Sequence, residues 1–135
     1  RLSVKRTNLL YIESADNYVC IWYLNKGVLT KFMLRNSLKS IEESLDETNV
    51  LRCHRSYMVN FDQVKVIRRE KDGIYLELGV EKVPDIPISK TYSETLVYDI
   101  FVVNYRDKVW SQYCVTFVRI RTIFVRKHTG LLLHE

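Results

Sequence analysis

Apolar and polar residues alternate with a period of two over much of the first half of the chain, a pattern typical of half-buried β-strands. The alternation is clearest at residues 9–13, 18–24 and 28–34. Asp16-Asn17 separates the first two segments and Asn25-Lys26-Gly27 separates the last two, where asparagine and glycine tolerate the positive φ of a tight turn. The three segments therefore predict a meander of antiparallel strands.

The period then lengthens to that of a helix. Leu34, Leu38, Ile41 and Leu45 are spaced by four, three and four residues, so they share one face of an amphipathic helix near residues 37–46. An asparagine and a serine directly precede this stretch, and either can cap the start of the helix.

Extended structure is predicted again after the helix. Alternation predicts strands at residues 64–68 and 74–78, with a glycine turn at 71–73, and a further short strand near Lys82-Val83. A polar helical turn over residues 91–96 can close the unit. The whole pattern predicts a mainly β fold, with short antiparallel strands in small packed sheets and one amphipathic helix.

Composition limits the class of protein. The chain has 135 residues, of which 47% are apolar, enough to bury the core of one compact domain. Its net charge of +5 permits a polyanionic partner without requiring one. No apolar run approaches the roughly 20 residues of a membrane helix, so we expect no membrane contact from this segment. The chain starts at Arg1 without a secretory signal, and we expect it to be a piece of a longer protein.

Cysteine usage indicates the compartment. Cys20, Cys53 and Cys114 lie far apart, and no Cys-x-x-Cys pair is present. This usage is typical of a reducing, cytoplasmic location, and it predicts neither a metal site nor a cofactor. Cys53 lies among basic residues, which can lower a thiol pKa, so a redox switch is an alternative to the simpler interpretation of a buried thiol.

Residues 52–60 are the most chemically informative segment, because they combine cations with hydrogen-bond donors. Arg52 and Arg55 offer planar guanidinium groups that fit guanine edges or phosphate, and His54 and Ser56 add shorter donors. A fully extended segment would place Arg52 and His54 on one side and Arg55 on the other, whereas a bulge or loop would turn all three outward. A solvated rim with a core-packed His54 is the alternative that residue chemistry leaves open.

Two further segments offer similar chemistry. Asn17 can pair with adenine and Tyr18 can donate to a phosphate, although a plain turn with an inward-facing tyrosine is an alternative for this segment. Ser89 and Lys90 follow a short apolar segment and form a third candidate loop. Lys90 is either a phosphate ligand or an ordinary exposed lysine.

Four motifs in order favour the nucleic-acid interpretation. Residues 9–14 (LLYIES), 17–18 (NY), 52–60 (RCHRSYMVN) and 86–90 (IPISK) resemble the core of the LytTR family of bacterial DNA-binding domains, over about residues 9–96. The resemblance implies an elongated β fold whose strand-end loops bind double-stranded DNA at repeated short motifs and bend it. Bending costs on the order of 1–6 kcal/mol, which extra contacts must offset.

The resemblance also implies individual roles. The position that matches Arg55 projects into a major groove in this family. Many members carry two basic residues where this chain has Lys90-Thr91, so phosphate contact rather than base reading is implied for Lys90. The family acts in transcription regulation, which implies an output domain of a longer signalling protein, such as a response regulator of a two-component system. A homodimer on repeated sites stays open.

The resemblance stops before the last part of the chain. We expect residues 1–96 to form the DNA-binding domain, and residues 97–135 to be a basic, β-prone extension to which we assign no role. A protein–protein interaction module that uses an exposed edge strand is the main alternative function. A small hydrolase built on His54 and Ser56 has the least support, because neighbours along a chain do not make a converging triad. No catalytic residue is therefore predicted.

Overall fold

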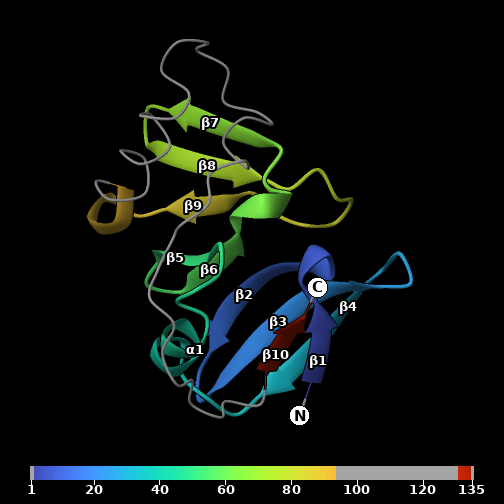
Figure 1. Ribbon diagram of the computed structural model, residues 1–135. Coiled ribbons are helices and arrows are strands. Elements are labelled where there is room, and N and C mark those ends of the chain that lie inside the picture. Colours follow the sequence, from blue (N-terminus) through green and yellow to red (C-terminus); the bar gives the residue numbers. More distant parts are fainter. Residues whose placement is uncertain (1, 94–130, 135) are drawn as a thin grey trace.

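The computed structural model describes residues 2–93 and 131–134, and these residues form mostly antiparallel strands in small sheets (Figure 1). The mainly β fold expected from the sequence is confirmed. The strands are β1 (Leu2–Lys5), β2 (Leu9–Ala15), β3 (Tyr18–Asn25), β4 (Val28–Leu34), β5 (Val50–His54), β6 (Tyr57–Asn60), β7 (Val66–Glu70), β8 (Gly73–Glu77), β9 (Ile86–Ile88) and β10 (Leu131–His134). The helical elements are α1 (Leu38–Ser44) and the 3₁₀ turns η1 (Arg6–Asn8) and η2 (Phe61–Gln63).

The larger sheet has the strand order β4-β3-β2-β6-β5, with every neighbouring pair antiparallel. It contains the predicted meander of β2, β3 and β4. The turn between β3 and β4 differs in detail from the expectation. Lys26 (φ 51°) and Gly27 (φ 80°) adopt positive φ, whereas Asn25 is the last residue of β3.

The smaller sheet has the order β7-β8-β9. Its first strand begins at Val66 rather than at Val64, because Val64 is buried at the end of η2. The strand expected near Lys82-Val83 is wrong: Lys82 lies in a turn with a φ of 71°, and the third strand is β9. Burial explains the difference, since Ile86 and Ile88 reach the core whereas Lys82 is exposed.

Two apolar cores lie on opposite faces of the larger sheet. The first fills the space between the two sheets, with Val59 from β6 and Leu76 from β8 among its buried members. The second is covered by α1 and the residue that follows it: Leu38, Ile41 and Leu45 are buried as their spacing predicted. Ser37 caps this helix, because its Oγ accepts a hydrogen bond of 3.2 Å from the backbone amide of Ser40.

The N-terminal strand lies beside the strand that is last along the chain. β1 and β10 pair in parallel, from Leu2 with Leu131 to Lys5 with His134, and Figure 1 shows them side by side. Residues 97–130 of the predicted extension lie outside the described residues, so the domain boundary at residue 96 stays a prediction. Residues 90–93 form a helical turn within the expected range, and the rest of that range is also outside the described residues.

No helix in the described part of the chain combines the length and the apolar character that crossing a lipid bilayer requires.

Candidate nucleic-acid interface

The three segments predicted to contact nucleic acid lie in a row, made of two turns at one end of the larger sheet and the residues that follow β9 of the smaller sheet. Because β2 and β6 are antiparallel, the end of β2 lies beside the start of β6, and the amide of Ser14 donates a 2.9 Å hydrogen bond to the carbonyl of Ser56. On the other side, the amide of Ser89 donates a 2.9 Å hydrogen bond to the carbonyl of Cys53. Residues 16–18, 54–56 and 89–90 therefore form a row, on the left of Figure 1, that we call the turn edge.

A bulge shapes the central member of this row. The β5–β6 register shifts between Arg52 and His54, and the chain reverses at Arg55-Ser56. Cys53 is consequently fully buried while Arg55 is exposed, so the fully extended arrangement does not hold. A bulge commonly re-aims side chains at a functional site, and here it directs Arg55 into solvent.

The guanidinium of Arg52 is held within the protein. Its Nε donates to the carbonyl of His54 at 3.0 Å, and its Nη2 donates to the carbonyl of Arg55 at 2.8 Å. Its Nη1 lies 3.4 Å from Oε1 of Glu42 on α1, and the group lies 6.0 Å from the ring centroid of Tyr92. The Arg52 side chain is only 15% exposed.

His54 is held in one tautomer by its neighbour. The backbone amide of Ser56 donates to Nδ1 of His54 at 3.1 Å, so the neutral ring carries its proton on Nε2 and presents a donor there. Burial lowers the pKa of His54, and the positive charges of Arg55 and Arg52 lower it further. The ring also packs edge-on against Tyr57, with 5.7 Å between centroids. It is half-buried at the turn edge rather than packed in the core.

The hydrolase alternative gains nothing from this geometry. The group of Ser56 that contacts His54 is its backbone amide, and that amide occupies the nitrogen that a catalytic base would need. A nucleophile must lie within hydrogen-bond reach of its base, with a third group to orient the base. The arrangement of His54 and Ser56 instead fixes the shape of the turn.

The first member of the row is exposed. Asp16 adopts a φ of 56°, which closes the tight turn between β2 and β3. Asn17 is exposed and Tyr18 is 42% exposed, so the alternative of an inward-facing tyrosine does not hold. Both side chains are available to a ligand at the turn edge.

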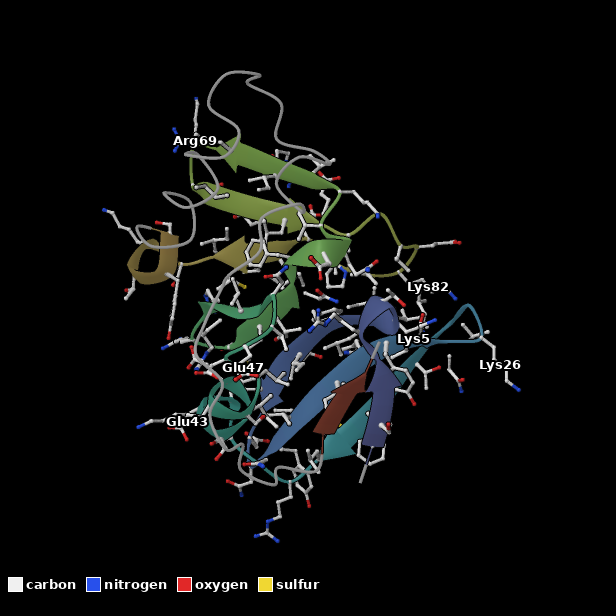
Figure 2. The ribbon with its side chains drawn as sticks, viewed as in Figure 1. Lys5, Lys26, Glu43, Glu47, Arg69 and Lys82 are labelled. Atoms are coloured by element: carbon white, nitrogen blue, oxygen red, sulfur yellow. The ribbon has the colours of Figure 1, made fainter. Side chains whose placement is uncertain are left out.

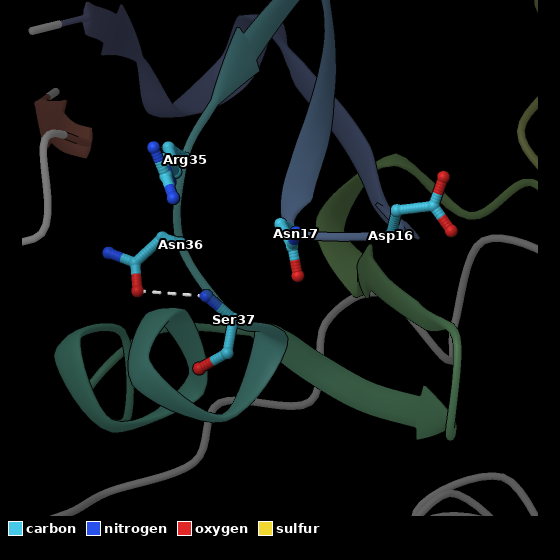
Figure 3. A pocket seen from close by; sticks show the side chains of 5 residues that line it. All are labelled: Asp16, Asn17, Arg35, Asn36 and Ser37. Carbon is cyan, nitrogen blue, oxygen red and sulfur yellow. Dashed lines mark hydrogen bonds between the residues drawn. The ribbon is translucent and has the colours of Figure 1, made fainter.

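An open pocket of about 390 Å³ extends the row beyond Asn17 (Figure 3). Its lining residues are Asp16, Asn17, Arg35, Asn36 and Ser37. In Figure 3 the carboxylate of Asp16 points away from the other four side chains. Arg35 was not among the predicted contact residues, although the sequence carried a signal for it. In the predicted meander the end of β4 returns beside the start of β3, where Leu34 pairs with Val19, so continuing the register puts Arg35 opposite Tyr18, the residue after Asn17.

The third member of the row offers one exposed cation. The carbonyl of Ser89 accepts hydrogen bonds from the amides of Tyr92 and Ser93, which begins the helical turn of residues 90–93. The hydroxyl oxygen of Ser89 is buried, without a hydrogen-bond partner in the described residues. Lys90 is exposed. The charge in this segment is therefore available to a ligand, whereas the serine hydroxyl is not.

Cys53 has the properties of a buried thiol. Its side chain is fully buried, and burial raises its pKa to about 12, which outweighs the lowering effect of nearby Arg52. A reactive cysteine needs the thiolate form and access to solvent, and Cys53 has neither at neutral pH.

Comparisons with known proteins identify the family of the chain. The family model described as the LytTr DNA-binding domain matches residues 2–98. An uncharacterized response regulatory protein of Vibrio cholerae is 29% identical over 65 residues, covering 48% of this chain and 25% of the relative. Sensory transduction protein LytT of Bacillus subtilis is 27% identical over 93 residues, covering 69% of this chain and 36% of the relative. The chain thus spans about a quarter to a third of the length of these curated relatives.

A solved structure supports the fold. The LytTr DNA-binding domain of a putative methyl-accepting/DNA response regulator from Bacillus cereus superimposes with a TM-score of 0.54 at 23% identity. The superposition covers 67% of this chain and 79% of that chain.

Proposed function

Because the chain belongs to the family of LytTr DNA-binding domains, we propose that its turn edge binds double-stranded DNA in a sequence-specific manner and thereby regulates transcription. The family resemblance inferred from residues 9–96 is confirmed, and the matched range is slightly longer. The single observation that carries the proposal is that Asn17, Arg55 and Lys90, which are far apart along the chain, are all exposed along the turn edge. The turns of Asn17 and Arg55 lie at one end of the larger sheet, and the Ser89 amide ties the segment of Lys90, which follows β9 of the smaller sheet, to Cys53.

The dimensions of the edge suit a duplex. Neighbouring strands are about 4.8 Å apart, so β4 and β5, four spacings apart, are separated by roughly 19 Å. A major groove is about 12 Å wide, so this row of turns is broad enough to contact base edges and the phosphates that flank the groove. Loops, rather than a recognition helix, would then enter the groove.

Roles follow from exposure and chemistry. Arg55 is the leading base reader, because its exposed guanidinium can donate two parallel hydrogen bonds to guanine. Asn17 can read adenine, and His54 can donate from Nε2 to a base or a phosphate. Tyr18 and Lys90 would bind phosphate. Ser56 would contribute mainly through the backbone amide that fixes His54.

The pocket beside Asn17 extends this footprint. Arg35 forms no ion pair with a carboxylate in the described residues, and it lies on the same edge as Asn17. A guanidinium in that position suits the phosphate next to the base that Asn17 would read. We therefore add Arg35 to the phosphate ligands.

Acidic residues of α1 and of the turn that follows it mark where the footprint ends. Glu43 and Glu47 lie on the side of the molecule where the turn edge is, whereas Lys5, Lys26 and Lys82 lie on the opposite side (Figure 2). A carboxylate surface repels phosphate. DNA would therefore contact the turns and leave the outer face of α1 free.

The biological context is proposed from the relatives. Their names describe a response regulatory protein and a sensory transduction protein, and each is much longer than the matched segment. We infer that this domain is the output part of a longer signalling protein. Binding of two copies to repeated sites would suit that role.

Selection from a randomised duplex pool tests the proposal. A sequence-specific domain enriches a short motif, and its affinity for that motif exceeds its affinity for random duplex at the same salt concentration. Salt-sensitive binding without enrichment would leave only general electrostatic attraction and would refute sequence-specific recognition.

A further inference from the structure

Arg52 lies beside the turn of residues 54–56 and also contacts Tyr92, near Lys90. Its side chain is held by the protein, whereas that of Arg55 is exposed. We propose that Arg52 is a positioning residue that sets the orientation of the His54-Arg55 turn. It also links that turn to α1 and to the segment that carries Lys90. The selectivity for bases therefore depends on the planar shape of the Arg52 guanidinium. This inference rests on the proposed DNA-binding function.

The geometry of the bulge explains why such a residue is needed. The register shift leaves an extra residue in β5, and next to it the carbonyls of His54 and Arg55 accept hydrogen bonds from a side chain. The bond to the His54 carbonyl is partly buried, and such a carbonyl without a donor is costly, so the turn would relax to find one. Arg52 supplies both donors, at 3.0 Å and 2.8 Å, and so fixes the backbone from which Arg55 projects.

The remaining contacts of Arg52 fix the guanidinium itself. Glu42 of α1 holds one end at 3.4 Å, and the ring of Tyr92 lies 6.0 Å from the group. Tyr92 belongs to the helical turn that begins with Lys90, and Ser89 is bonded to the carbonyl next to Arg52 in the chain. The base-reading turn and the phosphate-binding segment therefore share one rigid connection.

The same contacts argue against a direct DNA role for Arg52. All three guanidinium nitrogens have partners within the protein, and the side chain is 15% exposed. Three of its five N–H groups are directed at protein acceptors, so a phosphate would have to share the guanidinium with both backbone carbonyls and Glu42. Lysine would keep the charge, but it has a single ammonium in place of the planar fork and cannot reproduce the set of contacts.

The test compares charge with shape. We expect Arg52→Lys and Arg52→Ala to lower the ratio of specific to nonspecific affinity by a similar factor, about tenfold, because each misplaces the base reader. The slope of log affinity against log salt concentration should stay at the wild-type value in both variants, since no phosphate contact is lost. If Arg52→Lys restores wild-type affinity while Arg52→Ala lowers the salt slope, Arg52 is a phosphate ligand and the inference is overturned.

Two controls separate this effect from general destabilisation. Arg68 on β7 bonds Glu70, Glu77 and Asp85 and lies 5.4 Å from the ring of Tyr75, so Arg68→Lys breaks a comparable arginine network in the other sheet. That variant should keep the wild-type specificity ratio. Loss of specificity in Arg68→Lys as well would refute a local positioning role.

We expect the Glu42→Ala variant to stay folded, because its ion pair with Arg52 is partly exposed and contributes little to stability. It should lower the specificity ratio less than Arg52→Lys does. In NMR spectra of the free protein, the chemical shift of the Ser56 amide, which donates to His54, should change in Arg52→Lys. An unchanged chemical shift would contradict the role of Arg52 in shaping the turn.

Failure of this inference is distinguishable from failure of the proposed function. A wild-type protein that enriches no motif refutes sequence-specific DNA binding. A wild-type protein that enriches a motif, with Arg52→Lys showing the same motif and the same specificity ratio, refutes only the positioning role.

Discussion

The backbone amide of Ser14 lies 2.9 Å from the carbonyl oxygen of Ser56, and this hydrogen bond joins two turns that are some forty residues apart in the chain. It extends the β2–β6 pairing, which ends at Glu13 and Tyr57, by one further bond. Because the bond is between backbone atoms, it fixes the spacing of the two turns whatever side chains they carry. The turns of Asn17 and Arg55 are therefore held at a fixed spacing, which is what the proposed recognition of bases would need.

Arg55→Ala should weaken specific binding by about 1–3 kcal/mol and relax the preference at one base position, because it removes a two-pronged donor to a base edge. The measurement is a binding series on duplexes with single-base changes. Lys26→Ala is the matched control, since it removes one exposed positive charge at the far end of β3. An equal loss on every duplex would indicate that Arg55 binds phosphate instead.

Arg35→Ala should lower affinity for every duplex alike and reduce the salt slope by about one unit, because one phosphate contact and its released counterion are lost. Lys26→Ala removes the same formal charge away from the pocket and should leave the slope unchanged. If the two variants behave identically, the effect of Arg35 comes from net charge alone, and the pocket has no role.

The pH dependence of stability should carry a contribution from His54. Burial and two neighbouring arginines lower its pKa below the ordinary value of 6.5, so the native state takes up a proton less readily than the unfolded chain. The contribution is complete above pH 6.5 and is lost as the pH falls from 6.5 toward the native pKa. Wild type should thus lose more unfolding free energy between about pH 7 and pH 5.5 than His54→Gln does, by a small amount because the ring is half exposed. Equal losses in denaturant titrations would contradict this.

Cys53 should resist alkylation in the native protein. Burial raises its pKa to about 12, so thiolate is scarce at neutral pH and the sulfur is covered by the core. Peptide mapping after a brief iodoacetamide treatment should find Cys53 unmodified, and treatment in denaturant should modify it fully. Rapid native modification would revive the redox-switch alternative.

A chain that ends at Leu96 should still fold and recognise DNA. Among the residues that the structure describes, the buried members of both apolar cores lie between Val4 and Ile88, and the residues of the turn edge remain. The shorter chain lacks β10, so β1 loses its paired neighbour and the amides of residues 2–5 should exchange faster with solvent. Thermal unfolding and hydrogen exchange compare the two chains. An unfolded shorter chain would mean that the boundary at residue 96 is wrong.

The sequence by itself determined the local elements. Alternation at residues 18–24 and 28–34 requires strands, because one face of each is apolar, and the spacing of Leu38, Ile41 and Leu45 requires a helix. The four ordered motifs determined the family, since they combine residue identity with spacing. Local patterns also identified residues 52–60 as the segment that combines cations with hydrogen-bond donors.

Only the tertiary structure decided which of those side chains reach solvent. Arg52 and Arg55 have the same chemistry and lie three positions apart, yet a bulge leaves Arg55 exposed while Arg52 bonds two carbonyls. The position of the bulge depends on how β5 pairs with β6, and Arg35 joins the site only because β4 returns beside β3. Such pairings depend on contacts between distant residues, and a one-residue shift in register reverses the faces, so no local pattern could have fixed them.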